Sequence, residues 1–301
     1  MFSLYIAIVE NFLLFWYVFL HDKERVLMEF LKALFLGIIQ GITEWLPVSS
    51  TGHMLLFDEL FTLRVSEQCR ELFMVLVQLG SILAVIILYW HLLNPFSPTK
   101  SHKEKQQTWN LWIKVLVASI PAGIVGVLFD RQVDKYLYHW QVIVCALFLY
   151  GVLYIVLEKK NRENGKIERV RSLSQINYKD AITIGFFQML ALVPGTSRSG
   201  STILGAIIIG LNRQVASQFS FFMAIPVMVG ASLVKLLKLG FSLSLFEYLL
   251  LAVGFLSAFL VSLLVIKALL NYVRNHDFSV FGWYRIVLSF VVTVFFLVSG
   301  R

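Results

Sequence analysis

Residues 40–53 read QGITEWLPVSSTGH, and they place a glutamate, two serines, a threonine and a histidine within fourteen positions. An apolar segment at 29–45 runs up to Pro47, and a second short apolar segment begins at His53. Neither segment is a clean full membrane span. Because irregular backbone inside a bilayer is tolerated only where it faces protein or a cavity, we predict two half-helices joined by a re-entrant turn.

The composition is that of a protein with several membrane-spanning helices. The 301 residues are 58% hydrophobic and 15% charged, with a mean hydropathy of +0.77, whereas soluble domains carry roughly 25% charged residues. Long apolar runs without strand-like alternation favour helices over a β-barrel. The net charge of +8 fits basic cytoplasmic loops, so no nucleic-acid partner is expected. Cys69 and Cys145 are far apart and indicate neither a disulfide framework nor a metal site.

A second broken element resembles the first. Residues 194–202 read PGTSRSGST and separate two short apolar pieces, and GFFQ at 185–188 precedes them as GIIQ at 37–40 precedes the first turn. Three apolar spans follow each broken pair, at 72–90, 111–129 and 142–157, and at 216–239, 246–269 and 286–298. We therefore predict an all-α polytopic membrane protein with an inverted-topology repeat, in which each half is a re-entrant broken-helix pair plus three transmembrane helices.

The predicted boundaries follow from this order. Residues 1–27 form an N-terminal extension, either an added helix or the product of an unused upstream start; the first repeat is 28–157 and the second is 181–301. The linker at 158–180 is rich in lysine and arginine and is expected in the cytoplasm. A re-entrant pair returns to its own side and three spans change sides, so the second half is inverted. The two turns then enter from opposite faces and meet near the midplane.

Glu44 is the ionisable residue of the first turn. A carboxylate at that depth costs about 3 kcal/mol on insertion scales. It either pairs structurally or reaches an interface, or it serves as a general base or metal ligand, which we favour. Gln40 lies one helical turn earlier on the same face and can orient or coordinate, but it cannot take a proton.

Arg198 is the cation of the second turn, just before a half-helix. Its planar guanidinium suits a phosphate through two parallel hydrogen bonds, and the helix N-terminus adds backbone N–H groups and a positive dipole end. An arginine that only held loop carbonyls would leave the four nearby hydroxyls surplus; they belong to Ser197, Ser199, Ser201 and Thr202. We therefore predict that the two turns form one phosphate site.

His53 follows Ser49, Ser50 and Thr51, which favours a functional histidine over a buried structural one. Ser50 and His53 could form a nucleophile and its base, or His53 could accept the phosphate or protonate the leaving group. Gln78 lies within a span and either lines the cavity or bonds another helix. The tryptophans and tyrosines near span ends, Tyr284 among them, fit an aromatic belt.

These motifs resemble the undecaprenyl-pyrophosphate phosphatase family, the bacitracin-resistance phosphatases. The resemblance runs from about residue 28 to the C-terminus and rests on residues 40–53, 73–85 and 194–202. It implies a hydrolase that converts a C55 polyprenyl diphosphate to the monophosphate lipid carrier reused in peptidoglycan synthesis. It also implies a multi-pass protein of the bacterial plasma membrane, with its active site open to the outer face.

The resemblance implies roles for the matching residues. Glu44, Ser50, His53 and Arg198 would be catalytic, with Ser50 a candidate nucleophile. Residues expected to contact the substrate are Gln40, Ser49, Thr51, Gln78, Gln188, Ser197, Ser199 and Thr202. The family is linked to Mg²⁺ or Ca²⁺, and its first motif position is Glu or Gln. With Gln40 there, Glu44 is the one motif carboxylate, so we expect the cation to bridge it and the diphosphate.

A transporter or flippase of an anionic polyprenyl lipid is the alternative. It explains the inverted repeat and Arg198, but it does not require a serine and a histidine together. A purely structural subunit would leave the intramembrane charges without a task. The sequence leaves open the nucleophile, the metal, the oligomeric state (a homodimer is one option) and any lipid flipping that accompanies hydrolysis.

Overall fold

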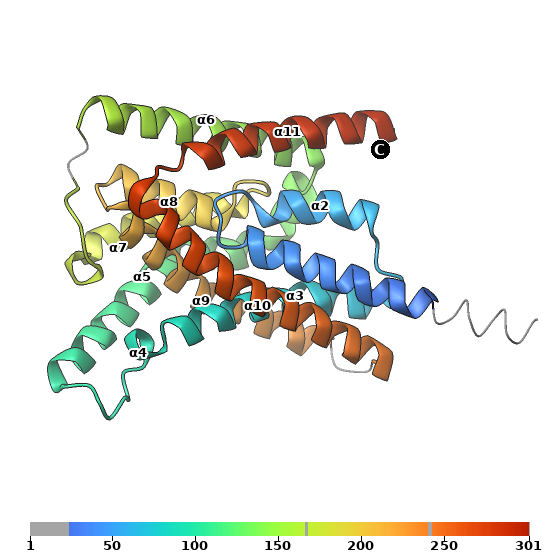
Figure 1. The fold of residues 1–301 in the computed structure, drawn as a ribbon, viewed down its shortest axis with the longest axis horizontal. Coiled ribbons are helices and arrows are strands. Elements are labelled where there is room, and N and C mark those ends of the chain that lie inside the picture. The colour runs from blue at the N-terminus through green and yellow to red at the C-terminus, as the bar shows by residue number, and fades with distance from the viewer. Residues whose placement is uncertain (1–23, 166–167, 240–242, 301) are drawn as a thin grey trace, which may run out of the picture.

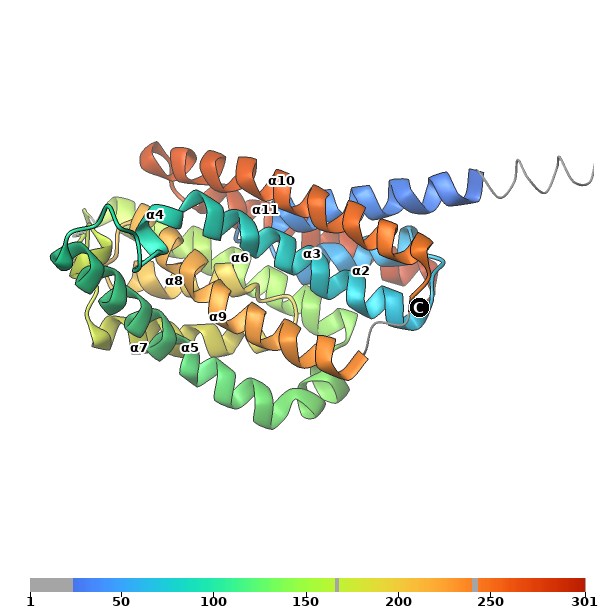
Figure 2. The ribbon, with the colours of Figure 1, turned by 90° about the horizontal axis from the view of Figure 1, so that it is seen from below.

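The computed structural model describes residues 24–165, 168–239 and 243–300. Most of the predicted extension at 1–27 therefore lies outside the described residues. Seven helices in the described part are long and apolar enough to cross a membrane, which confirms an all-α polytopic membrane protein. The helices at 140–163 and 279–299 lie side by side along the longest axis of the molecule, and those at 102–137 and 245–275 run obliquely to it (Figures 1 and 2).

The first described helix is Glu24–Thr43. The elements that follow are α2 (Ser50–Leu60), α3 (Glu67–Leu88), α4 (Trp90–Leu93), α5 (His102–Leu137), α6 (Trp140–Glu163), the 3₁₀ turn η1 (Leu173–Gln175), α7 (Tyr178–Met189), the 3₁₀ turn η2 (Leu190–Leu192), α8 (Arg198–Ile208), α9 (Arg213–Leu239), α10 (Leu245–Asn275) and α11 (Ser279–Ser299).

The chain breaks at both expected places. The helix Glu24–Thr43 stops before Pro47, and α2 runs back alongside it (Figure 1). In the second half α7 ends at Met189 and α8 begins at Arg198. The short helices α2 and α8 have 11 residues each, which is about 16 Å of helix and roughly half of a bilayer core. Neither of them can cross a membrane.

Several helices are longer than the apolar segments that predicted them, among them α5, α6, α10 and α11. The predicted half-helix at 29–45 lies in a helix that covers Glu24–Thr43 of the described residues and is long enough to span a membrane. Helix α5 was expected at 111–129 but extends over His102–Leu137. A capping box starts it: Ser101 Oγ accepts from the Glu104 N–H, and the Glu104 carboxylate accepts from the Ser101 N–H. Hydropathy does not detect such polar end turns.

The two glycines that open the GIIQ and GFFQ segments hold helices at backbone contact. A Cβ atom added to Gly37 would lie 2.5 Å from the Gly254 carbonyl oxygen of α10. A Cβ atom added to Gly185 would lie 2.4 Å from the Ala118 carbonyl oxygen of α5. Small residues permit such close approach between membrane helices. Each broken element is therefore anchored on a long helix by the same kind of contact, which fixes the depth of its turn.

Candidate active site

The two turns meet through direct side-chain contacts. Arg198 Nη2 donates to Glu44 Oε1 at 2.9 Å, across 154 residues of sequence. Ser199 Oγ lies 3.1 Å from the Glu44 carbonyl oxygen and 3.2 Å from that of Leu46, and donates to this pair of carbonyls. The structure therefore brings the predicted carboxylate and the predicted arginine into one buried ion pair.

Both short helices begin with the same unusual cap. Ser49 has φ 73° and Ser197 has φ 71°, the left-handed region that non-glycine residues rarely adopt. The Ser49 hydroxyl accepts from the Gly52 N–H at 3.3 Å, and the Ser197 hydroxyl accepts from the Gly200 N–H at 3.1 Å. The two helix N-termini, with their positive dipole ends, thus begin beside the ion pair. An anion would be stabilised there.

Glu44 is buried and accepts three side-chain hydrogen bonds. Besides Arg198, Gln40 Nε2 donates to Oε2 at 3.0 Å, and the Ser50 hydroxyl faces the same oxygen at 3.4 Å. Arg198 also donates from Nη1 to the Ser220 carbonyl at 2.7 Å, while its Nε is buried without a partner. Glu44 is therefore a base in contact with the Ser50 hydroxyl.

His53 is 4% exposed, and both of its ring nitrogens have partners. Nδ1 lies 2.7 Å from the Ser49 carbonyl oxygen, and Nε2 lies 2.6 Å from the hydroxyl of Tyr284. A hydrogen bond between Ser50 and His53 was one of the open alternatives. In the structure the ring nitrogens of His53 contact Ser49 and Tyr284 instead. Tyr284 belongs to α11 and had been placed in the aromatic belt, since nothing in its local sequence indicates a histidine partner.

Arg285 is a second residue that the sequence reasoning missed. It is fully buried and donates to the carbonyl oxygens of Pro47 at 3.1 Å, Gly195 at 2.8 Å and Thr196 at 2.9 Å, so it ties both turns to α11. Within the described residues it forms no ion pair. The last span was expected to begin at 286, but α11 begins at Ser279, which moves this arginine inside the span. An intramembrane arginine is the signal that would have singled it out.

The other predicted substrate-binding residues differ in their surroundings. The Thr202 hydroxyl shares a hydrogen bond with Ser220 Oγ at 2.7 Å. Gln188 is 1% exposed, and its amide nitrogen and oxygen are both without a partner. Thr51 and Gln78 are half-buried, in α2 and α3. No cluster of three His, Cys, Asp or Glu side chains that could hold a metal occurs in the described part of the chain.

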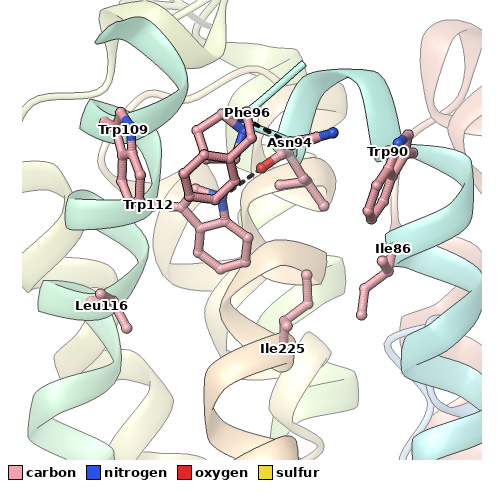
Figure 3. A pocket seen from close by; sticks show the side chains of 10 residues that line it. Ile86, Trp90, Asn94, Phe96, Trp109, Trp112, Leu116 and Ile225 are labelled. Atoms are coloured by element: carbon pink, nitrogen blue, oxygen red, sulfur yellow. Dashed lines mark hydrogen bonds between the residues drawn. The ribbon is translucent and has the colours of Figure 1, made fainter. Parts of the chain in front are cut away.

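An aromatic cavity of about 420 Å³ lies away from these residues, between α3, α4 and α5 (Figure 3). Trp90, Trp109 and Trp112 line it, and Ile225 of α9 closes it. Asn94 is its one polar side chain, and Asn94 Oδ1 accepts a hydrogen bond from the Phe96 N–H at 2.9 Å. None of its lining residues can transfer a proton near neutral pH.

The model of the bacitracin resistance protein BacA family matches residues 33–291, which include both turns, Tyr284 and Arg285. The chain belongs to this family. It is 52% identical over 270 residues to undecaprenyl-diphosphatase 1 of Clostridioides difficile, covering 90% of this chain and 97% of that protein. It is 49% identical over 271 residues to the undecaprenyl-diphosphatase of Acetivibrio thermocellus, covering 90% and 99%. The undecaprenyl-diphosphatase of Enterococcus faecalis is 51% identical over 267 residues, covering 88% and 96%.

Proposed function

We propose that the protein hydrolyses undecaprenyl diphosphate to undecaprenyl phosphate and inorganic phosphate in the bacterial plasma membrane. The lipid carrier is thereby returned to cell-wall synthesis, and the family is named for bacitracin resistance. Membership of the BacA family and relatives near 50% identity named for this reaction support the proposal. The structural observation that carries it is the buried contact between Arg198 and Glu44 beside two helix N-termini.

The terminal phosphate is bound by Arg198. Its Nη2 donates to Glu44 and its Nη1 to the Ser220 carbonyl, while its Nε has no partner. A phosphate can therefore bind the planar fork in place of Glu44. Arg285 adds a buried positive charge without an acidic partner among the described residues. We assign the remaining substrate contacts to the cap residues Ser49 and Ser197, with Thr51, Ser199, Thr202 and the glutamines Gln40, Gln78 and Gln188.

Ser50 is the nucleophile that the geometry favours. When Arg198 turns to the phosphate, Glu44 is free to take the proton of the Ser50 hydroxyl, 3.4 Å away. The Ser50 Oγ–P bond forms and the bridging P–O bond breaks, and the electron pair stays on the bridging oxygen of the lipid monophosphate. Water then hydrolyses the phosphoserine, with His53 as the second proton acceptor. Direct attack by water in the first step is the alternative.

A divalent cation, Mg²⁺ or Ca²⁺, fits only in a shared form. Glu44 is the single carboxylate of the site, and it already accepts from Arg198, Gln40 and Ser50. We propose that the diphosphate oxygens supply most of the ligands and Glu44 supplies one. The bound cation would neutralise charge on the phosphate oxygens.

The inverted repeat and its orientation are part of the same proposal. The two halves have matching serine caps and matching glycine contacts, which supports the proposal that they are structural repeats. The basic linker at 158–180 is assigned to the cytoplasm, and the site is assigned to the outer face. The relatives named for hydrolysis do not favour the transporter hypothesis.

Phosphate release from C55 diphosphate by the purified protein in detergent tests the function. The wild type is expected to release phosphate without a sealed membrane, and a chelator is expected to suppress the release. Arg198→Ala and His53→Ala are expected to abolish it at normal protein yield. A well-folded wild type that releases nothing, or full activity in either variant, would contradict the proposal.

A further inference from the structure

Tyr284 occupies a fixed position beside His53. It lies on α11, which packs against α6 through reciprocal glycines: a Cβ on Gly151 would lie 2.8 Å from the Gly282 oxygen, and a Cβ on Gly282 would lie 2.7 Å from the Gly151 oxygen. The next residue, Arg285, is bonded to the backbone of both turns. The Tyr284 and His53 rings are nearly parallel, with an interplanar angle of 10° and centroids 5.6 Å apart.

The partners of His53 determine its tautomer. A carbonyl oxygen can only accept, so Nδ1, 2.7 Å from the Ser49 oxygen, must carry a hydrogen. In the neutral imidazole Nε2 is then the acceptor, and the Tyr284 hydroxyl at 2.6 Å donates to it. The one lone pair with which His53 can take a proton therefore faces the phenol.

Tyr284 is the more exposed residue of this pair. Tyr284 is 46% exposed, whereas His53 is 4% exposed. The phenol is therefore the member of the pair that is open to its surroundings, and the imidazole is enclosed. A proton that goes to Nε2 in this arrangement has to pass through the Tyr284 hydroxyl.

We propose that Tyr284 is a positioning residue that fixes the tautomer of His53 and relays the proton between Nε2 and the attacking water. The inference rests on the proposed hydrolysis. As the water oxygen–phosphorus bond forms, the water gives a proton to the Tyr284 oxygen, and the Tyr284 proton moves to Nε2. The P–O bond to the leaving Ser50 oxygen breaks, and that oxygen keeps the electron pair and takes back the proton held by Glu44. Tyr284 stays neutral, His53 becomes imidazolium, and the proton returns to solvent by the reverse route.

Tyr284→Phe tests the relay, because it removes the hydroxyl and keeps the ring. We expect kcat on C55 diphosphate to fall at least tenfold, with KM within twofold and an unchanged melting temperature in detergent. In mixtures of H₂O and D₂O the wild-type kcat should depend on the deuterium fraction with curvature, because two protons move in one step, and the variant should give a straight line. Trp283→Phe, one residue earlier and exposed, is the matched control and should behave as the wild type.

A second measurement needs no activity. In ¹⁵N-histidine-labelled protein, the His53 signals, assigned by their loss in His53→Gln, should show the neutral tautomer with hydrogen on Nδ1. In Tyr284→Phe the Nε2 signal should shift. Wild-type kcat in Tyr284→Phe, or hydrogen on Nε2 in the neutral wild type, would overturn the inference. An absence of phosphate release by the wild type would contradict the proposed function instead, and the tautomer would still decide the role of Tyr284.

Discussion

The two turns share a scaffold but carry different chemistry. Aligned on their serine caps, Ser49 and Ser197, they match in the same register at the glycine before the turn, at the buried glutamine and at the glycine of the first helical turn. The reactive positions differ. Glu44 corresponds to Leu192, and Ser50 corresponds to Arg198.

This difference explains how one buried site can hold both a base and an anion-binding cation. Two copies of the first turn would bring two carboxylates together, and two copies of the second would bring two arginines together, each an uncompensated charge in a low-dielectric region. With one of each, the site holds an ion pair at 2.9 Å. The shared residues build the turn, and the residues that differ make it reactive.

Glu44→Gln should have the largest effect, because it removes the base but keeps hydrogen-bonding capacity. We expect kcat for phosphate release to fall by about 10³-fold or more, since general-base catalysis alone typically contributes 10²–10⁴. Leu192→Met, at the corresponding position of the second turn, is the matched control and should stay within about twofold of wild type. Equal losses in the two variants would show that the turns are not specialised.

Arg285→Met should come next, because it leaves the carbonyls of both turns without their shared donor. Each unsatisfied buried group costs about 1–3 kcal/mol, so we expect a lower melting temperature and about 100-fold less phosphate release. Arg285→Lys keeps the charge but lacks the fork that reaches Pro47, Gly195 and Thr196 together. Arg285→Lys should therefore release phosphate at a rate between those of the wild type and Arg285→Met. If Arg285 acted through its charge alone, Arg285→Lys would instead be as active as the wild type.

Gly37→Ala and Gly185→Ala test whether the two halves are anchored equally. The added Cβ atoms would lie 2.5 and 2.4 Å from carbonyl oxygens of α10 and α5, and overpacking of this kind costs about 1–3 kcal/mol. Both variants should melt at a lower temperature, and by similar amounts. Gly230→Ala in α9 meets nothing within 4 Å and should be neutral or slightly stabilising. If only one of Gly37→Ala and Gly185→Ala lowered the melting temperature strongly, the stability of the fold would depend mainly on that half.

The matched glutamines should give the smallest and most selective effects. Gln40 donates to Glu44 at 3.0 Å, so Gln40→Leu is expected to lower kcat about tenfold. Gln188 has no partner, and its replacement by leucine should leave the melting temperature unchanged or raised. If Gln188 contacts the substrate, as proposed, KM for the C55 diphosphate rises in Gln188→Leu; an unchanged KM would remove it from the site.

Much of the fold was predictable because membrane helices are long and apolar. The prolines, glycines and hydroxyl residues at 44–53 and 194–202 indicated where the chain would break. Helix ends were predicted less well, since polar turns such as the first turn of α5 are invisible to hydropathy but are stabilised by capping. The start of α11 at Ser279 was missed although this helix has no side-chain cap, and Arg285 was missed with it.

The candidate site could also be predicted only in part from the sequence. Glu44, Gln40 and Arg198 could be selected because each is a polar residue in an apolar neighbourhood, with a reason to face the others. The partners of His53 could not be selected. Tyr284 lies 231 residues away, in a segment where an aromatic side chain is common at a membrane interface. Only the packing of α11 on α6 brings the two rings together.

The ion pair between the turns also constrains how the protein is made. Glu44 and Arg198 are 154 residues apart, and domains emerge from the ribosome N-terminus first, so the glutamate reaches the membrane long before its arginine exists. Until the second half arrives, the first turn has neither its counter-ion nor the Arg285 clamp. The first turn can therefore form its contacts with Arg198 and Arg285 only after α8 and α11 have been inserted.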